Sequence, residues 1–225
     1  MQTQAGDDLI ERIRTHSADD TVVGPAANDL LSELFAGYPV ENLQRLLRSG
    51  DDAAVGTGTW LLSELGERAA PLLDEVPALL AHPLRRVRYF AIEVVLLSTD
   101  AAHGPVIAQV MNLSRDPERA IRGKVLEFLA EAADDQLAAG AAALEPGQVK
   151  ELVEWLIRLD GEEEPDPRDI VARLEGPDPV ARLFAAAAAA HLSDAEDMNL
   201  LRHAATAEDE EISSFARRQL GELAE

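Results

Sequence analysis

Residues 116–126 read DPERAIRGKVL, residues 82–92 read HPLRRVRYFAI, and residues 178–186 read DPVARLFAA. The three stretches share one pattern. Each opens with a polar residue and a proline, continues with an apolar residue and an arginine, and has an alanine or valine three residues after the arginine. A weaker copy, DEEISSFA, occupies residues 209–216. A recurring pattern of this kind indicates that the chain is built from repeated units.

The apolar residues at the centre of the pattern are regularly spaced. These anchors are Val55, Val87, Ile121, Ala181 and Ile212, and the successive gaps are 32, 34, 60 and 31 residues. Because a gap of 60 residues is close to two periods, we expect a degenerate repeat in between, near Val149. A period of about 30–34 residues is typical of an α-solenoid, a superhelix of stacked helix pairs. We therefore predict an all-α fold with an α-solenoid architecture.

The start of each copy has the features of a helix N-terminus. Asp116 and Asp178 each precede a proline, which places an N-cap acceptor directly before a residue that favours the first helical turn. Beyond the start, apolar residues follow helical spacing, as in Ile121, Val125 and Phe128. Shorter amphipathic segments separate these helices. The predicted unit is therefore a short helix, a turn and a longer helix.

We predict one continuous domain over residues 1–225. Residues 1–50 are expected to supply helices that cap the array, and residues 51–225 to contain the repeats. The stretch GEEEPDP at 161–167 combines acidic residues with prolines and a glycine, so we expect a loop or a weak joint there.

The pattern resembles HEAT repeats, particularly the short bacterial kind, in which the second helix often opens with Asp-Pro, then an apolar residue and arginine. The matching positions are Asp116-Pro117 with Ile121-Arg122, His82-Pro83 with Val87-Arg88, and Asp178-Pro179 with Ala181-Arg182. The resemblance covers roughly residues 50–225 and departs from the pattern at Gly56 and Ser213, which stand where the arginine belongs. It implies a fold and a binding habit, and it leaves the function open.

The repeat arginines Arg88, Arg122 and Arg182 have a structural interpretation. In an array of repeats, each could bridge to the acidic start of a neighbouring repeat. We therefore expect a ladder of ion pairs between repeats rather than a ligand site.

The chain is strongly acidic, with 20 basic and 42 acidic residues, a net charge of −22 and a pI near 4.5. Such a charge repels nucleic acid and anionic membranes and attracts a basic protein partner, although it also serves solubility alone. The N-terminus lacks a signal-peptide pattern, and the longest apolar run, 183–190, is too short to span a bilayer. We therefore expect a cytoplasmic protein without a membrane contact.

Sequence motifs for catalysis are missing. The chain has no cysteine, and its five histidines show no metal-ligand spacing. It contains no nucleophile elbow, no P-loop and no dinucleotide fingerprint, since GTGTW at 56–60 holds only a G-x-G inside a helical pattern. We predict that the protein is not an enzyme and that it needs no cofactor or metal.

Charge is unevenly distributed along the sequence. Residues 83–124 hold seven basic and four acidic residues, a net charge of +3, whereas residues 160–225 hold 6 basic and 17 acidic residues, a net charge of −11. A dipolar array of this kind suits a protein partner with a complementary charge pattern.

Helical geometry indicates which side chains of the second helices point away from the core, namely those two, six and nine positions after each anchor. Second helices line the concave surface of a solenoid, so we predict a partner-binding stripe there, with two of its residues at the edges. Its residues are Tyr89, Glu93, Leu96, Lys124, Glu127 and Glu131. Trp60 and Trp155 are interpreted as core residues rather than binding hot spots.

Three functions stay open at this point. The first is a protein-binding module, an immunity- or antitoxin-like inhibitor or an adaptor, that binds a basic partner; strong negative charge and a repeat groove favour it. The second is nucleic-acid binding or DNA repair, as in bacterial HEAT-like glycosylases, for which the basic window 83–124 is the one supporting feature. The third is a helper similar to phycobiliprotein lyases, which also use HEAT-like repeats. The partner and the oligomeric state are left open.

Overall fold

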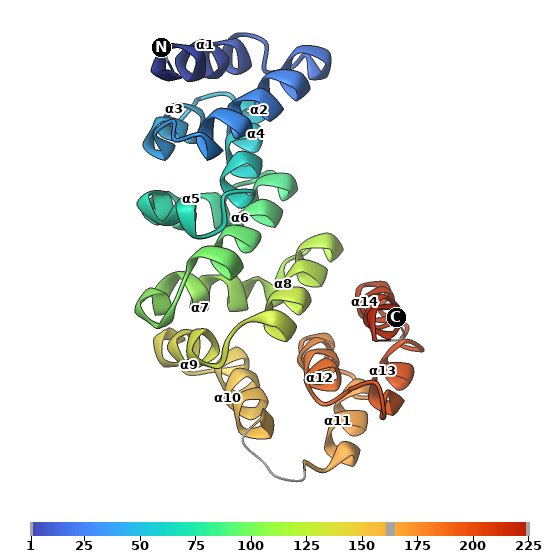
Figure 1. Ribbon diagram of the computed structural model, residues 1–225. Coiled ribbons are helices and arrows are strands. Elements are labelled where there is room, and N and C mark those ends of the chain that lie inside the picture. Colours follow the sequence, from blue (N-terminus) through green and yellow to red (C-terminus); the bar gives the residue numbers. More distant parts are fainter. Residues whose placement is uncertain (1, 161–164, 224–225) are drawn as a thin grey trace. The chain divides into compact units, whose positions relative to one another are not determined.

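The computed structural model describes residues 2–160 and 165–223, and every regular element within them is a helix (Figure 1). The all-α prediction is confirmed. The chain divides into two compact units, an N-terminal unit of residues 1–99 and a C-terminal unit of residues 100–225. The single-domain organisation of residues 1–225 stays a prediction.

The N-terminal unit is built from helix pairs in which neighbours along the chain pack together. Its α-helices are α1 (Gln2–Thr15), α2 (Asp20–Phe35), α3 (Gln44–Leu47), α4 (Asp52–Ser63), α5 (Val76–Leu80) and α6 (Arg85–Ser98), with 3-10 turns η1 (Val40–Leu43) and η2 (Gly66–Glu75). Helix α1 packs on α2, α3 on α4, and both η2 and α5 on α6. The second helices α4 and α6 also pack on each other, which joins successive pairs.

Side-chain caps begin two of the longer helices of this unit, α2 and α4. The Asp19 carboxylate accepts a hydrogen bond from the backbone N–H of Thr21 at 3.0 Å at the start of α2. Asp51 accepts one from the N–H of Ala54 at 2.9 Å at the start of α4. These bonds satisfy backbone donors that a helix leaves unpaired. The bond from the Ala54 N–H also lowers the pKa of the Asp51 carboxyl.

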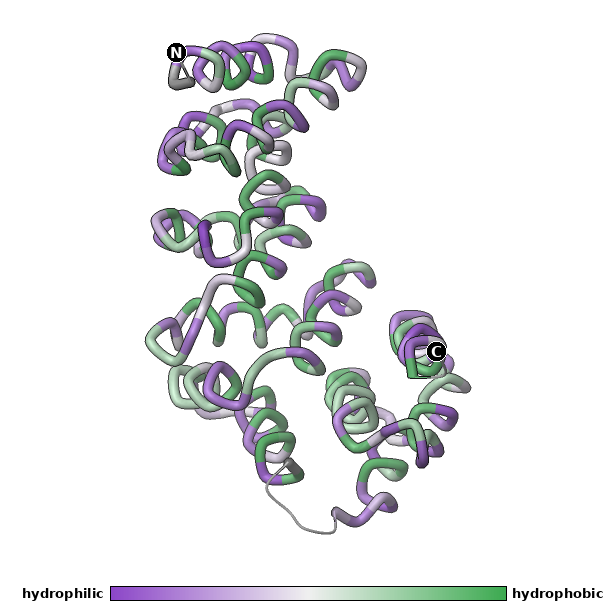
Figure 2. The backbone as a smooth tube through the Cα atoms, in the orientation of Figure 1, coloured by the Kyte–Doolittle hydropathy of each residue, from purple (hydrophilic) through white to green (hydrophobic). Residues whose placement is uncertain are grey.

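The C-terminal unit alternates short and long helices, as the repeat pattern predicts. The described α-helices are α7 (Gly104–Asn112), α8 (Arg119–Glu131), α9 (Asp134–Ala143), α10 (Gln148–Asp160), α11 (Pro167–Leu174), α12 (Pro179–His191), α13 (Asn199–Ala204) and α14 (Glu210–Glu222). Helix α12 contacts α8, α10 and α14 as well as its neighbours along the chain. Five consecutive alanines at 185–189 allow these close approaches, and all five are fully buried. Most of α12 is correspondingly coloured as hydrophobic in Figure 2.

Of the two predicted Asp-Pro helix starts, one is confirmed and the other is wrong. Asp178 is the N-cap of α12, accepts a hydrogen bond from the Val180 N–H at 3.0 Å, and is followed by Pro179 in the first turn. Asp116 instead accepts a bond from the N–H of Glu118 at 2.8 Å, and α8 begins only at Arg119. Asp116 thus lies two residues before the N-cap of α8, Glu118.

The predicted anchors are core residues with one exception. Val55, Val87, Ile121 and Ile212 are buried, and so is Val149 at the predicted degenerate repeat. The anchor at Ala181 is displaced by one residue, because Ala181 is half-buried while the preceding Val180 is buried. An alanine contributes too little apolar surface to compete for the core position with an adjacent valine.

The three repeat arginines share one contact that spacing alone does not reveal. Arg88 donates to the backbone carbonyls of His82 at 2.8 Å and Pro83 at 2.9 Å. Arg122 bonds the carbonyls of residues 116 and 117, and Arg182 bonds that of residue 176, at 2.9–3.1 Å. Each arginine therefore closes the turn that precedes its own helix, in addition to any bridge between repeats.

The acidic stretch 161–167 is only partly described. Residues 161–164 lie outside the described residues, and α11 begins at Pro167, where Asp166 accepts a hydrogen bond from the N–H of Arg168 at 2.9 Å. In the described parts of the chain, none of the helices has the length and apolar character required to cross a membrane.

Candidate functional site

A pocket of about 420 Å³ opens on the second helices of the N-terminal unit. Its lining comes from the segment just before α2 and from α2, α4 and α6, and consists of Ser17, Asp20, Val23, Gly24, Ala27, Asn28, Ala53, Thr57, Trp60, Arg86 and Phe90. Val23 and Ala27 are buried, whereas Trp60 and Phe90 are half-buried. The pocket thus combines an apolar base with two accessible aromatic side chains, the composition typical of a binding site.

Arg86 reaches this pocket across the backbone of a glycine. A Cβ atom at Gly56 would lie 2.7 Å from Nη2 and 3.0 Å from Nε of Arg86. The absence of a side chain at Gly56 therefore leaves the space that the guanidinium occupies on α4. This contact gives a physical reason for the departure from the repeat pattern at Gly56, where an arginine is expected.

Two polar groups of the pocket have no partner in the described residues. Within residues 2–160 and 165–223, no hydrogen bond or ion pair joins Arg86 to another group. The indole N–H of Trp60 likewise has no acceptor there, in contrast to Trp155, which donates to the Asp169 carboxylate at 2.8 Å. Both groups are therefore able to bond an external acceptor.

Of the predicted stripe, the three residues on α6 lie on the helix that carries Arg86 and Phe90. Tyr89, Glu93 and Leu96 are all half-buried. The Tyr89 ring packs edge-on against the ring of Phe90, with centroids 5.7 Å apart and an interplanar angle of 89°. Tyr89 therefore supports a wall of the pocket, although it is not itself part of the lining.

The stripe residues on α8 belong to the C-terminal unit and have a different environment. Lys124 and Glu127 form an ion pair at 2.9 Å, and their side chains are only 10% and 17% exposed. Arg218 of α14 binds the other oxygen of Glu127 at 2.6 Å. Glu131 is exposed at the end of α8. Helix α14 therefore contacts the middle of the predicted stripe through Arg218. A partner would have to displace α14 to reach Lys124 and Glu127.

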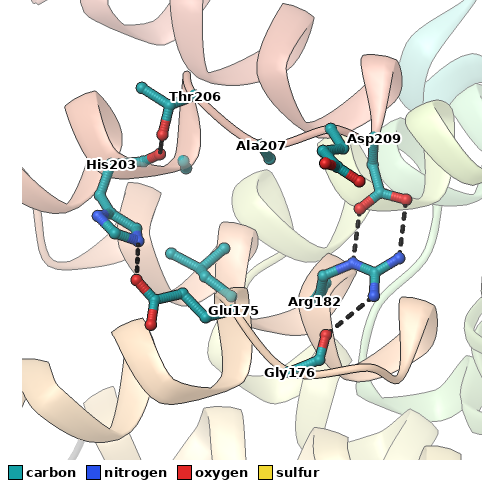
Figure 3. A pocket seen from close by; sticks show the side chains of 10 residues that line it. Glu175, Gly176, Arg182, His203, Thr206, Ala207 and Asp209 are labelled. Atoms are coloured by element: carbon teal, nitrogen blue, oxygen red, sulfur yellow. Dashed lines mark hydrogen bonds and ion pairs between the residues drawn. The ribbon is translucent and has the colours of Figure 1, made fainter.

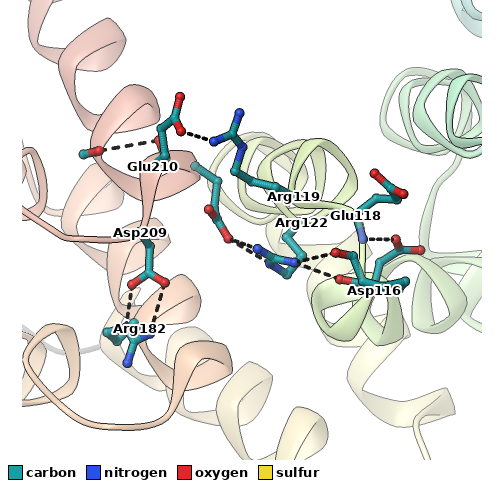
Figure 4. Close-up of polar contacts among 10 residues, drawn as sticks. Asp116, Glu118, Arg119, Arg122, Arg182, Asp209 and Glu210 are labelled. Atoms are coloured by element: carbon teal, nitrogen blue, oxygen red, sulfur yellow. Dashed lines mark hydrogen bonds and ion pairs between the residues drawn. The ribbon is translucent and has the colours of Figure 1, made fainter.

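Further ion pairs hold the acidic start of α14 to the basic start of α8 (Figure 4). Arg122 bonds the carboxylate of Glu211 at 2.8 Å, and Arg119 pairs with Glu210. The Glu211 side chain is 7% exposed, so its charge depends on this arginine. The basic residues of α8 are thus largely neutralised by carboxylates of the same unit.

A pocket of about 690 Å³ in the C-terminal unit has a polar lining (Figure 3). Arg182 binds both oxygens of Asp209, at 2.6 and 3.0 Å, which raises the pKa of the Arg182 guanidinium. On the opposite side, the imidazole of His203 lies 3.3 Å from a carboxylate oxygen of Glu175. The charged groups of this pocket bind each other, which leaves less for a ligand to pair with than in the N-terminal pocket.

The histidine and carboxylate side chains of the described residues were the candidates for metal binding. No group of three or more histidine or carboxylate side chains among them is placed to hold a metal ion. His191 and His203 do not meet, since His191 lies against the backbone carbonyl of Leu129 at 2.9 Å. The absence of a cofactor and of an enzymatic activity stays a prediction.

Three residues that define the pocket of the N-terminal unit, Arg86, Phe90 and Trp60, are not part of the predicted binding stripe. Arg86 and Phe90 stand four residues apart and therefore share a face of α6, one that is rotated from the predicted stripe. Trp60, predicted to be a core residue, is half-buried and lines the pocket, whereas Trp155 is buried as predicted. One signal in the sequence pointed to Arg86, namely the glycine at position 56, one repeat earlier, where the repeat pattern has an arginine.

Comparison with known proteins leaves the family open. No protein-family model matches the chain, and no curated protein is significantly similar to it in sequence.

Proposed function

We propose that this protein is a HEAT-like α-solenoid whose function is to bind another protein. The repeat pattern, the alternation of short and long helices and the shared turn-closing arginines support the HEAT-like architecture. Repeat arrays of this type act mainly by presenting the surface of their second helices to a partner.

The pocket of the N-terminal unit carries the proposal. It lies on second helices, it exposes Trp60 and Phe90, and its Arg86 has no partner among the described residues. Partly exposed aromatic and arginine side chains in a pocket are the residues that most often dominate protein–protein affinity. Among the described residues, no group of three or more histidine or carboxylate side chains is placed to hold a metal ion.

Charge favours a basic partner at long range. The net charge of −22 produces an attractive field for a basic protein, which would raise the association rate at low salt. An immunity-like inhibitor of a basic toxin and an adaptor for a basic protein both meet this description.

A capture experiment tests the proposal. The purified chain serves as bait in a lysate of its native host, first at low and then at high salt, and each retained protein is then purified and its affinity measured. We expect a specific basic partner whose binding weakens with salt. Phe90→Ala should weaken that binding at least about tenfold, whereas Phe35→Ala, an exposed phenylalanine outside the pocket, should leave it unchanged. Retention of no specific protein at either salt would refute the proposal.

The alternative of nucleic-acid binding gains no support from α8. Its basic residues face carboxylates of α14 or of α8 itself, so they do not form a continuous cationic surface for phosphates. A gel-shift assay at low salt distinguishes the two functions, since a protein-binding module of this charge should shift neither DNA nor RNA.

A further inference from the structure

We propose that the pocket of the N-terminal unit binds a carboxylate together with an adjoining apolar side chain, presented by an acidic–apolar segment of the protein partner. This inference rests on the proposed function, because it assumes that the occupant belongs to a protein. It adds which chemical groups of the partner would enter the pocket, namely a carboxylate and an apolar side chain.

The apolar part of the pocket is the expected binding site for the partner's apolar side chain. Val23 and Ala27 form a buried base, and Trp60 and Phe90 add aromatic surface that stays partly accessible. A volume of about 420 Å³ lies within the usual range of ligand pockets. A leucine or phenylalanine side chain would cover the aromatic surface and remove it from water.

Arg86 is the group expected to bind the partner's carboxylate. Its guanidinium is placed over the backbone at Gly56 and lacks an anionic partner among the described residues, although the N-terminal unit holds 15 acidic and only 8 basic residues. Three other arginines of this unit, Arg14, Arg45 and Arg48, each pair with a carboxylate, as Arg45 does with Asp7 at 2.7 Å. An arginine left without one beside an apolar pocket suits a planar carboxylate that binds two of its N–H groups.

The charges around the pocket limit the ligand to a single negative charge. Asp20 also lines the pocket and is exposed, and Asp51 lies close by, where its carboxylate binds Ser17 and the Ala54 N–H. Their negative potential disfavours a phosphate or a nucleic-acid backbone beside Arg86. The combination of one cation and nearby carboxylates therefore selects a monoanion attached to an apolar group.

Nuclear magnetic resonance of the full-length chain tests this inference with small probes. The signals of the two indole N–H groups, Trp60 in the pocket and Trp155 bonded to Asp169, act as site and internal control. N-acetyl-L-phenylalanine supplies the apolar side chain and the carboxylate, and its amide supplies the side chain alone. We expect the acid to shift the Trp60 signal only, with an affinity about tenfold higher than that of the amide.

Two charge-matched variants identify the cation. Arg86→Gln should reduce the affinity for the acid to that for the amide, whereas Arg85→Gln, one residue away and outside the pocket lining, should leave the preference intact. Equal binding of acid and amide by the unaltered protein, an unchanged preference in Arg86→Gln, or no Trp60 shift at millimolar probe would each overturn the inference.

The outcome is separable from that of the capture experiment. If a protein partner is captured but neither probe shifts Trp60, the proposed function stands and this inference fails. If the acid binds through Arg86 but no protein is ever retained, the pocket is a site for small carboxylates, and the assignment of a protein occupant is wrong.

Discussion

Arg86 of the N-terminal unit contrasts with three arginines on the second helices of the C-terminal unit. In the N-terminal unit, Arg86 lines a pocket and has no partner among the described residues. In the C-terminal unit, Arg119, Arg122 and Arg182 are all bound by carboxylates at the start of α14. Arginines of second helices thus provide binding capacity in one unit and internal cohesion in the other.

The difference shows that an acidic segment can pair with arginines of its own unit and so occupy sites that a partner would otherwise use. In the run EDEE at 208–211, three of the four carboxylates form ion pairs with arginines that precede them by 27 to 91 residues. Helices α8, α12 and α14 are consequently joined both by apolar packing and by charge. Among the described residues of the N-terminal unit, no carboxylate of a helix start pairs with Arg86, so this side chain is available to a partner.

The largest effect is expected from disturbing the tight packing around α12. Ala187 is fully buried between several helices, so Ala187→Leu should reduce the free energy of unfolding by about 1–3 kcal/mol through overpacking. Ala172→Leu, on the exposed side of α11, should change it by less than about 0.5 kcal/mol. Urea denaturation in a Trp60→Phe background, in which Trp155 is the sole tryptophan and reports on this unit, measures both. Equal stability of the two variants would show that α12 is loosely enclosed.

The closure of α14 on α8 should depend on the buried ion pair more than on the exposed one. Arg122→Ala leaves the Glu211 carboxylate, 7% exposed, without its cation, and should cost about 2 kcal/mol. Arg119→Ala breaks a pair in which both side chains are more than half exposed, and should cost less than about 1 kcal/mol. The same denaturation assay compares them, and a reversed order would contradict the assignment of Glu211 as the critical carboxylate.

Alkaline pH should weaken the N-terminal unit selectively. Burial, and secondarily the hydrogen bond to Asp7, raise the pKa of Tyr38 to about 12 from the ordinary value of 10.0. Because the folded state holds this proton more tightly than the unfolded state, the stabilisation is complete below pH 10 and is lost as the pH rises from 10 towards 12. The free energy of unfolding should fall by about 1 kcal/mol between pH 9 and 11.

The measurement uses chemical denaturation in a Trp155→Phe background, so that Trp60 reports on the N-terminal unit. Tyr38→Phe should flatten this part of the pH profile, whereas Tyr89→Phe should preserve it. An identical slope in Tyr38→Phe would show that another group titrates.

The smallest change in stability is expected at Gly56. Gly56→Ala should alter the free energy of unfolding by no more than about 1 kcal/mol, because helix propensity improves and the atoms in the way are the end of a flexible side chain. The new methyl group would nevertheless push the Arg86 guanidinium away, so we expect the affinity for N-acetyl-L-phenylalanine to fall several-fold. Gly221→Ala, with open space around it, controls for propensity alone. An undiminished affinity would mean that Gly56 does not position Arg86.

The amino-acid sequence by itself determined the helical class, the alternation of short and long helices, and most of the core. These features depend on neighbours within one or two helical turns, so the spacing of residues such as Val87 and Ile121 is sufficient to predict them. The exact starts were less predictable, because Asp116 and Asp178 have the same local sequence signal and cap different turns.

Only the tertiary structure decided which charges are used and which remain available. The pairing of Arg122 with Glu211 joins residues 89 positions apart, and the placement of Arg86 depends on a glycine in the preceding repeat. A periodic pattern specifies that a residue faces outward from its helix, but not which other helix meets it there. That choice follows from how the helices pack in space, and it separates the pocket of one unit from the closed surface of the other.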